Sequence, residues 1–171
     1  MDDNDCSDFR DEMLTTHNAL RAEHGSKQLR HSEDLIKDTQ MWANIIADKG
    51  FVQFSELPGR GENIVFVDTN GSRPNGSDVT ELWYKEIENY DHTHPQWSKD
   101  SMNYTQLIWK SSTEIGVGIS KVKGQNKYVV VAQYRPSGNI NTPAEFRKNV
   151  LPPNSNNAQK CNDSLSIKAD E

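Results

Sequence analysis

A change of periodicity within residues 103–119 constrains the fold more than any other feature of the sequence. Tyr104 and Leu107 stand at helical spacing in the first half of this segment. In the second half, apolar residues alternate with Gly116 and Gly118, which is typical of a strand that another backbone approaches closely. The segment therefore predicts a short helix that leads directly into a central strand, and any chemistry of the domain is expected near that junction.

Amphipathic helices and a few strands are expected in the rest of the chain. The first two helices each end at a glycine, and Asp78 is expected to cap a third. Helices before and between a few strands indicate an α+β domain in which helices cover a small sheet. The expected helices lie at 7–24, 32–49, 78–90 and 103–108, and the expected strands at 65–67, 115–119 and 127–133.

Length, charge and hydropathy argue against several classes of function. A chain of 171 residues suffices for one domain, and a mean hydropathy of -0.86 indicates that polar loops and tails dilute its core. We expect polar tails at 1–7 and 153–171 around a domain at 8–152. The net charge of -6 is spread, and no run of Lys and Arg offers a surface to nucleic acid. No apolar run approaches the length of a transmembrane segment.

The N-terminus and the two cysteines bear on the compartment. The acidic residues at 2–5 are unlike a signal peptide, so the chain is either cytosolic or a mature secreted product behind an added methionine. The cysteines and the glycosylation sequons favour the second interpretation. Cys6 and Cys161 lie near opposite ends of the chain. A disulfide between them would stabilise the domain by up to about 4–5 kcal/mol in the chain-entropy model. The alternative is two unpaired thiols in terminal tails.

Four Asn-X-Ser/Thr sequons also favour secretion, at Asn70, Asn75, Asn103 and Asn162. Asn103 has two interpretations, because an N-cap side chain turns back to its helix whereas a glycosylated one faces solvent. We expect Asn103 to be the cap, with Gln106 completing a capping box. Sugar is then expected at the other three sequons.

Few residue combinations suggest catalysis or metal binding. Glu62 precedes a predicted strand, and Glu86 lies on the inward face of a predicted helix. In the alternative, which the residues alone favour, both glutamates accept hydrogen bonds that tie a loop to a helix. Asp91, His92 and His94 lack a fourth ligand at useful spacing, and the chain has no nucleophile elbow. We therefore predict no catalytic residue and no metal site.

Five short motifs follow one another between residues 8 and 152. They are His17-Asn18-Ala19-Leu20-Arg21, Gly61-Glu62-Asn63-Ile64, Trp83-Tyr84-Lys85-Glu86-Ile87, Tyr104-Thr105-Gln106-Leu107-Ile108-Trp109 and Tyr134-Arg135-Pro136-Ser137-Gly138-Asn139. In this order they resemble the CAP superfamily, which includes the cysteine-rich secretory, antigen 5 and pathogenesis-related-1 proteins. With so few cysteines, the chain looks most like the cysteine-poor venom-allergen-like proteins of parasitic worms. The resemblance implies a three-layer α-β-α sandwich.

The resemblance also implies a central cavity in which two histidines and two glutamates hold a divalent cation, usually zinc. Glu62 and Glu86 match the glutamates, whereas Asn103 and Phe54 stand where histidines are expected. Two carboxylates and an amide are poor ligands for zinc, and a harder cation needs more oxygen atoms. The chain is therefore predicted to bind no zinc appreciably and to need no cofactor.

Lipid binding is the other property that the resemblance implies. Family members bind sterols through an aromatic loop after the Trp-Tyr-X-Glu-Ile helix, and some hold a fatty acid between two helices. The matching loop at 90–101 carries Tyr90, His92, His94 and Trp97 as candidate sterol contacts. In the alternative, Tyr90 and Trp97 pack the loop onto the domain.

Together these features predict a secreted, non-enzymatic CAP domain that binds sterols or fatty acids and also engages host or cell-surface proteins. The alternative is an extracellular protein-interaction module that binds a receptor or matrix component, with lipid binding incidental. A sterol-binding assay separates the two, because an interaction module shows no saturable binding.

Overall fold

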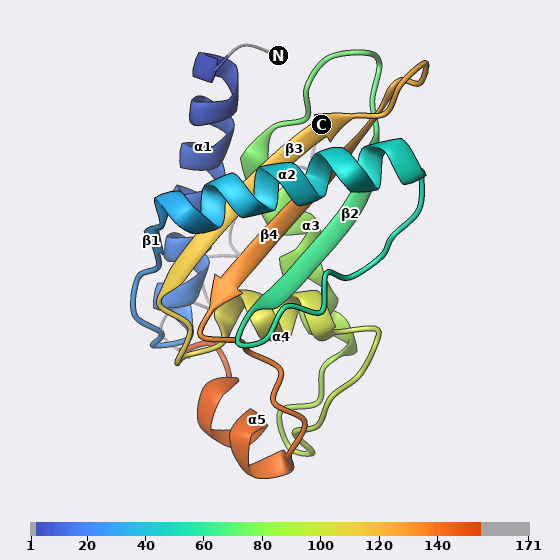
Figure 1. Ribbon diagram of the computed structural model, residues 1–171. Coiled ribbons are helices and arrows are strands. Elements are labelled where there is room, and N and C mark those ends of the chain that lie inside the picture. Colours follow the sequence, from blue (N-terminus) through green and yellow to red (C-terminus); the bar gives the residue numbers. More distant parts are fainter. Residues whose placement is uncertain (1–2, 155–171) are drawn as a thin grey trace, which may run out of the picture.

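The computed structural model describes residues 3–154 as a three-layer α-β-α sandwich (Figure 1). Its helices are α1 (Asp3–Glu23), α2 (Glu33–Lys49), α3 (Gly76–Tyr84), η1 (Lys85–Asn89, a 3-10 helix), α4 (Met102–Ile108) and α5 (Pro143–Asn149). Its strands are β1 (Arg30–His31), β2 (Gly61–Asp68), β3 (Glu114–Lys121) and β4 (Lys127–Arg135). Cys161 and Asn162 lie outside the described residues, so the disulfide and that glycosylation site stay predictions.

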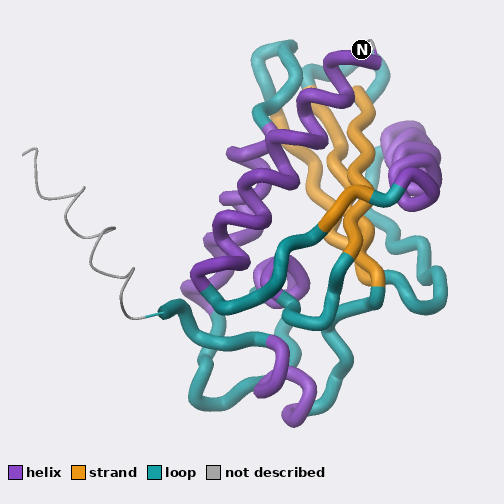
Figure 2. Tube along the Cα trace, turned by 90° about the vertical axis from the view of Figure 1, so that its left-hand side faces the viewer, coloured by secondary structure: helices purple, strands orange, loops and turns teal. Residues whose placement is uncertain are grey.

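These strands form one sheet in the order β1-β3-β4-β2. β1 runs parallel to β3, whereas β3-β4 and β4-β2 are antiparallel pairs. Figures 1 and 2 show the sheet between α2 on one side and α1 on the other. Gln133 of β4 stands opposite both Glu62 of β2 and Gly116 of β3. Residues opposite one another share a face, so these three positions belong to the face that α2 covers.

Two glycines of β3 allow α2 to lie directly on the sheet. A Cβ atom at Gly116 would lie 2.4 Å from the carbonyl carbon of Leu35, and one at Gly118 would lie 2.5 Å from the carbonyl oxygen of Thr39. These separations are far below van der Waals contact, so only glycine fits at either position. The expectation that these glycines admit a neighbouring backbone is confirmed, and that neighbour is α2.

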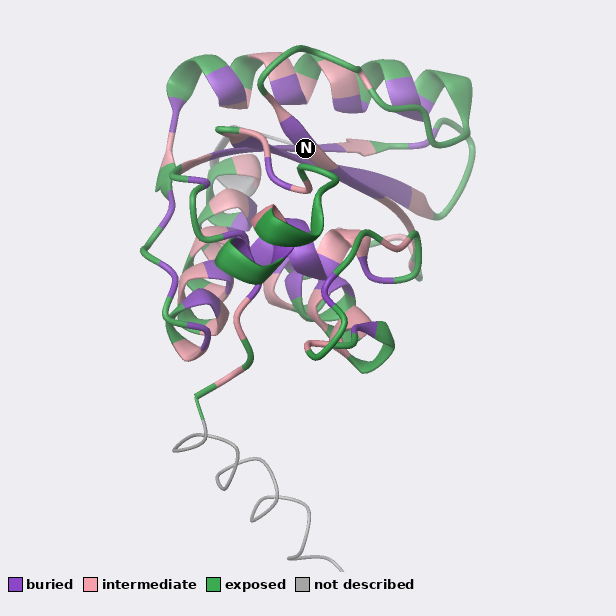
Figure 3. Cartoon of the chain, turned by 90° about the horizontal axis from the view of Figure 1, so that it is seen from below, coloured by how far each residue is buried: buried purple, intermediate pink, exposed green. Residues whose placement is uncertain are grey.

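Each face of the sheet has its own hydrophobic core. On one face, Ala43 and Ile46 of α2 pack against Ile64, Val129 and Val131. Figure 3 shows buried residues between the layers and many exposed residues along α2. Because side chains alternate along a strand, the position of a residue on β2 decides which core it meets. The core on the other face includes Phe9, Met13, Trp83, Tyr104, Leu107, Trp109, Val130 and Phe146.

The third helix starts earlier than expected. Asn75, rather than Asp78, occupies the N-cap of α3, and its Oδ1 accepts a 2.7 Å hydrogen bond from the amide of Ser77. A carboxylate oxygen of Glu12 on α1 accepts a 2.7 Å hydrogen bond from the amide of Gly76. The start of α3 is therefore set by its own N-cap and by contact with α1, and local sequence does not reveal the second of these.

Other differences from expectation concern the ends of the chain. α1 begins at Asp3 rather than at Ser7, and α5 was not expected. Thr142 caps α5, with its Oγ1 accepting a 3.2 Å hydrogen bond from the amide of Glu145, and a proline follows the cap. This Thr-Pro-X-Glu pattern is a helix-start signal, so α5 was predictable.

The domain limits of 8–152 stay a prediction. Within residues 3–154, no helix is long and apolar enough to cross a membrane.

His17 of α1 is a fully buried imidazole. Its Nδ1 lies 2.8 Å from the carbonyl oxygen of Met13 and must donate, because a carbonyl oxygen only accepts. Its Nε2 then accepts from the hydroxyl of Tyr134 at 2.8 Å, and that hydroxyl oxygen accepts from Nδ2 of Asn63 at 3.2 Å. Burial lowers the pKa of His17 to about 3, so the ring stays neutral at ordinary pH.

The free energy of unfolding is expected to fall as the pH drops below about 6.5, the usual pKa of histidine. Below that pH the unfolded chain binds a proton at His17 that the folded chain does not bind until the pH reaches about 3. The resulting loss is about 1.4 kcal/mol per pH unit. Urea unfolding between pH 7 and pH 5 measures it above the range in which most carboxylates titrate. His17→Gln should reduce the slope by about one proton, and an unchanged slope would contradict this role.

Candidate functional site

Glu86 of η1 satisfies the free amides at the start of α4. Its Oε2 accepts hydrogen bonds from the amides of Asn103 (2.9 Å) and Tyr104 (3.2 Å), and its Oε1 accepts one from Nδ2 of Asn103 (2.6 Å). Burial raises the pKa of the Glu86 carboxyl, although these hydrogen bonds act in the opposite direction. Glu86 therefore ties η1 to α4 across the junction that the sequence singled out.

The expectation that Asn103 caps α4 is wrong. Ser101 occupies the N-cap position, without a side-chain hydrogen bond. Because the carboxylate of Glu86 already accepts from the first amides, the side chain of Asn103 donates to it instead of capping the helix. The capping-box role of Gln106 is also wrong, since its Oε1 accepts a 2.9 Å hydrogen bond from the amide of Gly138.

A pocket of about 400 Å³ opens beside Glu86 and Asn103, where β2 faces α3 and η1. Two side chains that line it carry a buried polar atom without a hydrogen-bond partner in the described part of the chain, namely Oδ1 of Asn103 and Nε1 of Trp83. A free acceptor beside a carboxylate suits a ligand that donates hydrogen bonds. The other lining residues are Val65, Leu82, Lys85, Glu88 and Asn89.

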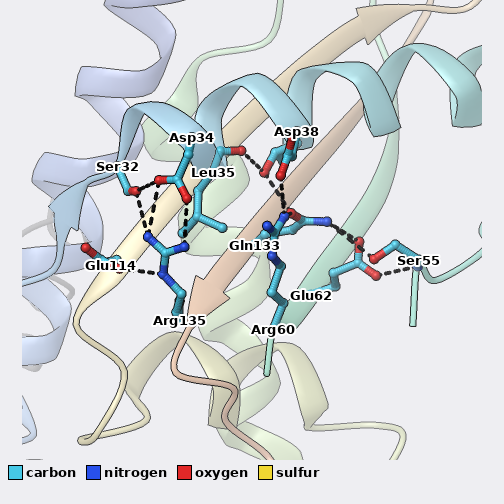
Figure 4. Close-up of polar contacts among 11 residues, drawn as sticks. Ser32, Asp34, Leu35, Asp38, Ser55, Arg60, Glu62, Glu114, Gln133 and Arg135 are labelled. Atoms are coloured by element: carbon cyan, nitrogen blue, oxygen red, sulfur yellow. Dashed lines mark hydrogen bonds and ion pairs between the residues drawn. The ribbon is translucent and has the colours of Figure 1, made fainter. Parts of the chain in front are cut away.

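Glu62 belongs to the opposite face of the sheet. Its Oε1 accepts a hydrogen bond from the amide of Ser55 (2.6 Å), and its Oε2 accepts one from Nε2 of Gln133 (2.9 Å), on the face that α2 covers (Figure 4). The next residue of β2, Asn63, points the other way and donates to the first turn of α4 at 3.0 Å. Glu62 and Glu86 therefore serve separate sides of the sheet. Both glutamates accept hydrogen bonds that join segments, as the alternative predicted, but Glu62 joins a loop to a strand and Glu86 joins η1 to α4, so neither ties a loop to a helix.

The four residues that the resemblance places in one cavity do not line one pocket. Phe54 is 38% exposed on the loop before β2, and neither it nor Glu62 lines the pocket beside Glu86. Among residues 3–154, no group of three His, Cys, Asp or Glu side chains could hold a metal ion. One carboxylate and the amide of Asn103 do not fit zinc, which takes four nitrogen, sulfur or oxygen ligands. The expectation that the chain binds no zinc appreciably stays a prediction, which calorimetry can test.

One half of the loop at 90–101 packs onto the domain. Tyr90 is buried, and its ring centroid lies 4.8 Å from that of His92, 5.7 Å from Tyr104 and 6.5 Å from Phe146. Nε2 of His92 lies 3.0 Å from the hydroxyl of Tyr104. Burial lowers the pKa of His92 and raises that of Tyr90 to about 12. For Tyr90, the packing alternative describes the observed position.

The other half of the loop faces solvent. Trp97 is 43% exposed, and His94 is exposed with its Nδ1 2.8 Å from Oδ2 of Asp91. Nδ2 of Asn89 donates to the carbonyl oxygen of Asp100 at 3.1 Å, which joins the two ends of the loop. The four candidate sterol contacts are thus split, with Tyr90 and His92 turned toward the domain and the other two available to a ligand.

A groove of about 350 Å³ on the α2 face was missed by sequence reasoning. We call it the α2 groove. Its lining residues are Asp38, Met41, Trp42 and Ile45 of α2, Ser55, Leu57 and Arg60 of the following loop, and Gln133 of β4. A signal existed, because Met41 and Ile45 are exposed apolar residues outside the buried stripe of α2.

The three sequons within the described residues differ in accessibility. Asn70 and Asn75 are exposed on the loop between β2 and α3, although Oδ1 of Asn75 also caps α3. Asn103 is half-buried and bonded to Glu86, so sugar there would require this contact to open. Occupancy at Asn70 and Asn75 stays a prediction for peptide mapping.

Comparisons with known proteins agree with these features. A family model described as "CAP: Cysteine-rich secretory protein family" matches residues 14–134. Human Golgi-associated plant pathogenesis-related protein 1 is 30% identical over 148 residues, which cover 85% of this chain and 94% of that protein. Protein PRY2 of Saccharomyces cerevisiae is 32% identical over 147 residues, which cover 85% of this chain but 42% of PRY2.

A solved structure also resembles this one. Schistosoma mansoni venom allergen-like protein 4 aligns with a TM-score of 0.61 at 20% identity, over 84% of this chain and 95% of that one. At this identity the likeness shows the fold alone. It confirms the three-layer sandwich that the motifs predicted.

Proposed function

Because the chain belongs to the cysteine-rich secretory protein (CAP) family, we propose that it is a secreted, non-enzymatic protein that binds sterols or fatty acids. The family description supports secretion, and the exposed sequons at Asn70 and Asn75 are compatible with it. The glutamates at the predicted centre support the absence of catalysis, because each is occupied in hydrogen bonds between segments of the chain.

The observation that carries the lipid proposal is the position of Trp97. Its side chain is 43% exposed on a loop whose base is held by the buried Tyr90 and by the hydrogen bond from Asn89 to Asp100. A large flat side chain on a fixed base loses little conformational entropy when it covers the apolar body of a ligand. His94 lies exposed on the same loop and can contact a polar group of that ligand.

Equilibrium binding of radiolabelled cholesterol tests this proposal. We expect saturable binding to the wild-type chain, competed by unlabelled cholesterol. The variant Trp97→Ala with His94→Ala should bind less cholesterol at saturation, because it removes the exposed surface of the loop. Lys99→Ala is the matched control, since it changes an exposed side chain of the same loop. A wild-type chain without saturable binding would favour the protein-interaction module instead.

A further inference from the structure

Exposed apolar side chains of the described residues are concentrated in one region. Most of the large ones belong to the second half of α2 and to the loop that follows it, and they are Met41, Ile45, Phe51, Val52, Phe54 and Leu57. Scattered single hydrophobic residues on a surface need no explanation, but a contiguous group indicates a binding surface. Three of these residues, Met41, Ile45 and Leu57, line the α2 groove.

The walls of the groove are apolar on two sides. Met41, Trp42 and Ile45 project from α2, and Leu57 projects from the facing loop. Met41 is 55% exposed, Ile45 42% and Leu57 43%, so a ligand seated here would remove a large apolar area from water. The volume of about 350 Å³ is at the lower end of the range for ligand sites. It suits the rigid part of an apolar ligand whose remainder lies along the exposed loop.

The polar lining of the groove favours a neutral head group. Nη1 of Arg60 lies 2.8 Å from Oδ2 of Asp38 and 3.3 Å from Oε1 of Gln133 (Figure 4). The charges of Arg60 and Asp38 offset each other, so Asp38 opposes the attraction of a carboxylate to Arg60, and Arg60 opposes the attraction of an ammonium group to Asp38. A hydroxyl group can donate to Asp38 and accept from Arg60 without bringing a charge into the groove.

The other partners of this polar group keep it in place. Oε2 of Glu62 accepts from Nε2 of Gln133, whose Oε1 also accepts from the hydroxyl of Thr39 at 3.2 Å. Gln133 is fully buried, and it links Arg60 to both the sheet and α2. The head-group contacts are therefore fixed before a ligand arrives, which reduces the entropic cost of binding.

We propose that the α2 groove is a second sterol-binding site, separate from the loop at 90–101. This inference rests on the proposed function, because it assumes that the chain binds sterols. The fused rings lie between α2 and the loop that carries Leu57, and the hydroxyl group meets Asp38 and Arg60. Phe51 and Phe54, both exposed on that loop, are available to cover the part of the ligand that the groove leaves in solvent.

Equilibrium binding of radiolabelled cholesterol to the full chain tests the second site. Wild type is expected to bind two molecules, whereas Met41→Gln with Ile45→Gln binds one. Both side chains are exposed, so the substitutions leave the buried stripe of α2 intact. Ile140→Gln changes a side chain that is 48% exposed outside the groove and should still bind two molecules. Circular dichroism melting curves verify that the variants fold.

Competition with palmitate tests the role of the head group. In Trp97→Ala with His94→Ala, where the groove site is expected to remain, palmitate should compete at least about tenfold less well than cholesterol. Adding Asp38→Asn removes the repelling carboxylate and leaves Arg60, so palmitate should then compete about tenfold better. Equal competition by the two lipids before that change would overturn the argument for a neutral ligand.

The outcomes separate this inference from the proposed function. No cholesterol binding by wild type contradicts both. Binding of two molecules by the groove variant contradicts the groove site but not the proposed function. The same holds if wild type binds one molecule and only the Trp97 variant loses it. Loss of all binding in the groove variant would keep the groove as a sterol site and remove the loop from the proposed function.

Discussion

Replacing Arg21 with methionine is expected to lower the free energy of unfolding by roughly 3–6 kcal/mol. Arg21 is fully buried, and its guanidinium donates to four carbonyl oxygens. Nε donates to Lys27 (2.9 Å), Nη1 to Leu107 (2.9 Å) and Trp109 (3.0 Å), and Nη2 to Ser112 (2.9 Å). The methionine side chain fills part of the space but donates nothing. The buried carbonyl oxygens of Leu107 and Ser112 then lose this donor. The carbonyl oxygen of Trp109 keeps a 3.1 Å hydrogen bond from the amide of Ser112, and that of Lys27 belongs to an exposed residue.

The expected loss is large because the penalties accumulate at one place. A buried acceptor that loses its partner costs about 1–3 kcal/mol, so two of them, together with the weakened contacts at Trp109 and Lys27, take up a large part of the stability of a typical domain. Burial lowers the pKa of Arg21 to about 10, which leaves the group charged at neutral pH. Its replacement therefore also removes the cost of a buried charge, and this gain limits the total loss to roughly 3–6 kcal/mol.

Urea unfolding followed by tryptophan fluorescence measures this effect. Arg30→Met is the matched control, because the Arg30 side chain is 76% exposed in its 2.9 Å ion pair with Glu114, and such surface pairs contribute about 0–1 kcal/mol. Arg21→Lys should fall between the two, since an ammonium group donates three hydrogen bonds but lacks the planar fork. If the free energy of unfolding of Arg21→Met falls by less than about 2 kcal/mol, the carbonyl oxygens have found other donors. The role assigned to Arg21 would then be wrong.

Local patterns predicted the helices and strands well where short-range chemistry decides them. α2 runs from the residue after Ser32 to the residue before Gly50, and Gly50 has the left-handed backbone, with φ of 75°, that ends many helices. The alternation of Ile115, Gly116 and Val117 likewise predicted β3. In each case the residues that define the element are neighbours in sequence.

The candidate site was harder to predict because distant contacts decide it. The carboxylate that caps α4 comes from Glu86, on another helix, so no pattern around Asn103 could reveal it. The side of the sheet on which Glu62 lies depends on β2 starting at Gly61 and on its register with Gln133. A glutamate placed before the strand, as the sequence suggested, has no defined face. The strand register thus separates two residues that motif order had placed together.

The loop at 90–101 shows a similar limit. Tyr90 and Trp97 are both aromatic residues in a polar segment, and composition alone does not distinguish them. Tyr90 packs against Tyr104 and Phe146, which come from α4 and α5. α5 was not expected from the sequence, so the part of this surface that Phe146 supplies was not expected either.

Replacing Gly116 with valine is expected to cost at least about 3 kcal/mol, beyond the usual range for overpacking a core. The first added carbon would lie 2.4 Å from the carbonyl carbon and 2.6 Å from the carbonyl oxygen of Leu35. These are backbone atoms of α2, so no side-chain rotation relieves the contact and the helix itself must move. Movement of α2 would also separate Ala43 and Ile46 from Val131, and the second core would lose its packing.

Thermal and urea unfolding of Gly116→Val beside Ser120→Val measure this cost. Ser120 lies on the same face of β3 but is partly exposed, so the same valine there should change the free energy of unfolding by less than about 1 kcal/mol. Because α2 carries Met41 and Ile45, a displaced helix should also weaken sterol binding in the α2 groove at temperatures where Gly116→Val remains folded. Equal stability of the two variants would mean that α2 is not held against β3 as closely as the glycines indicate.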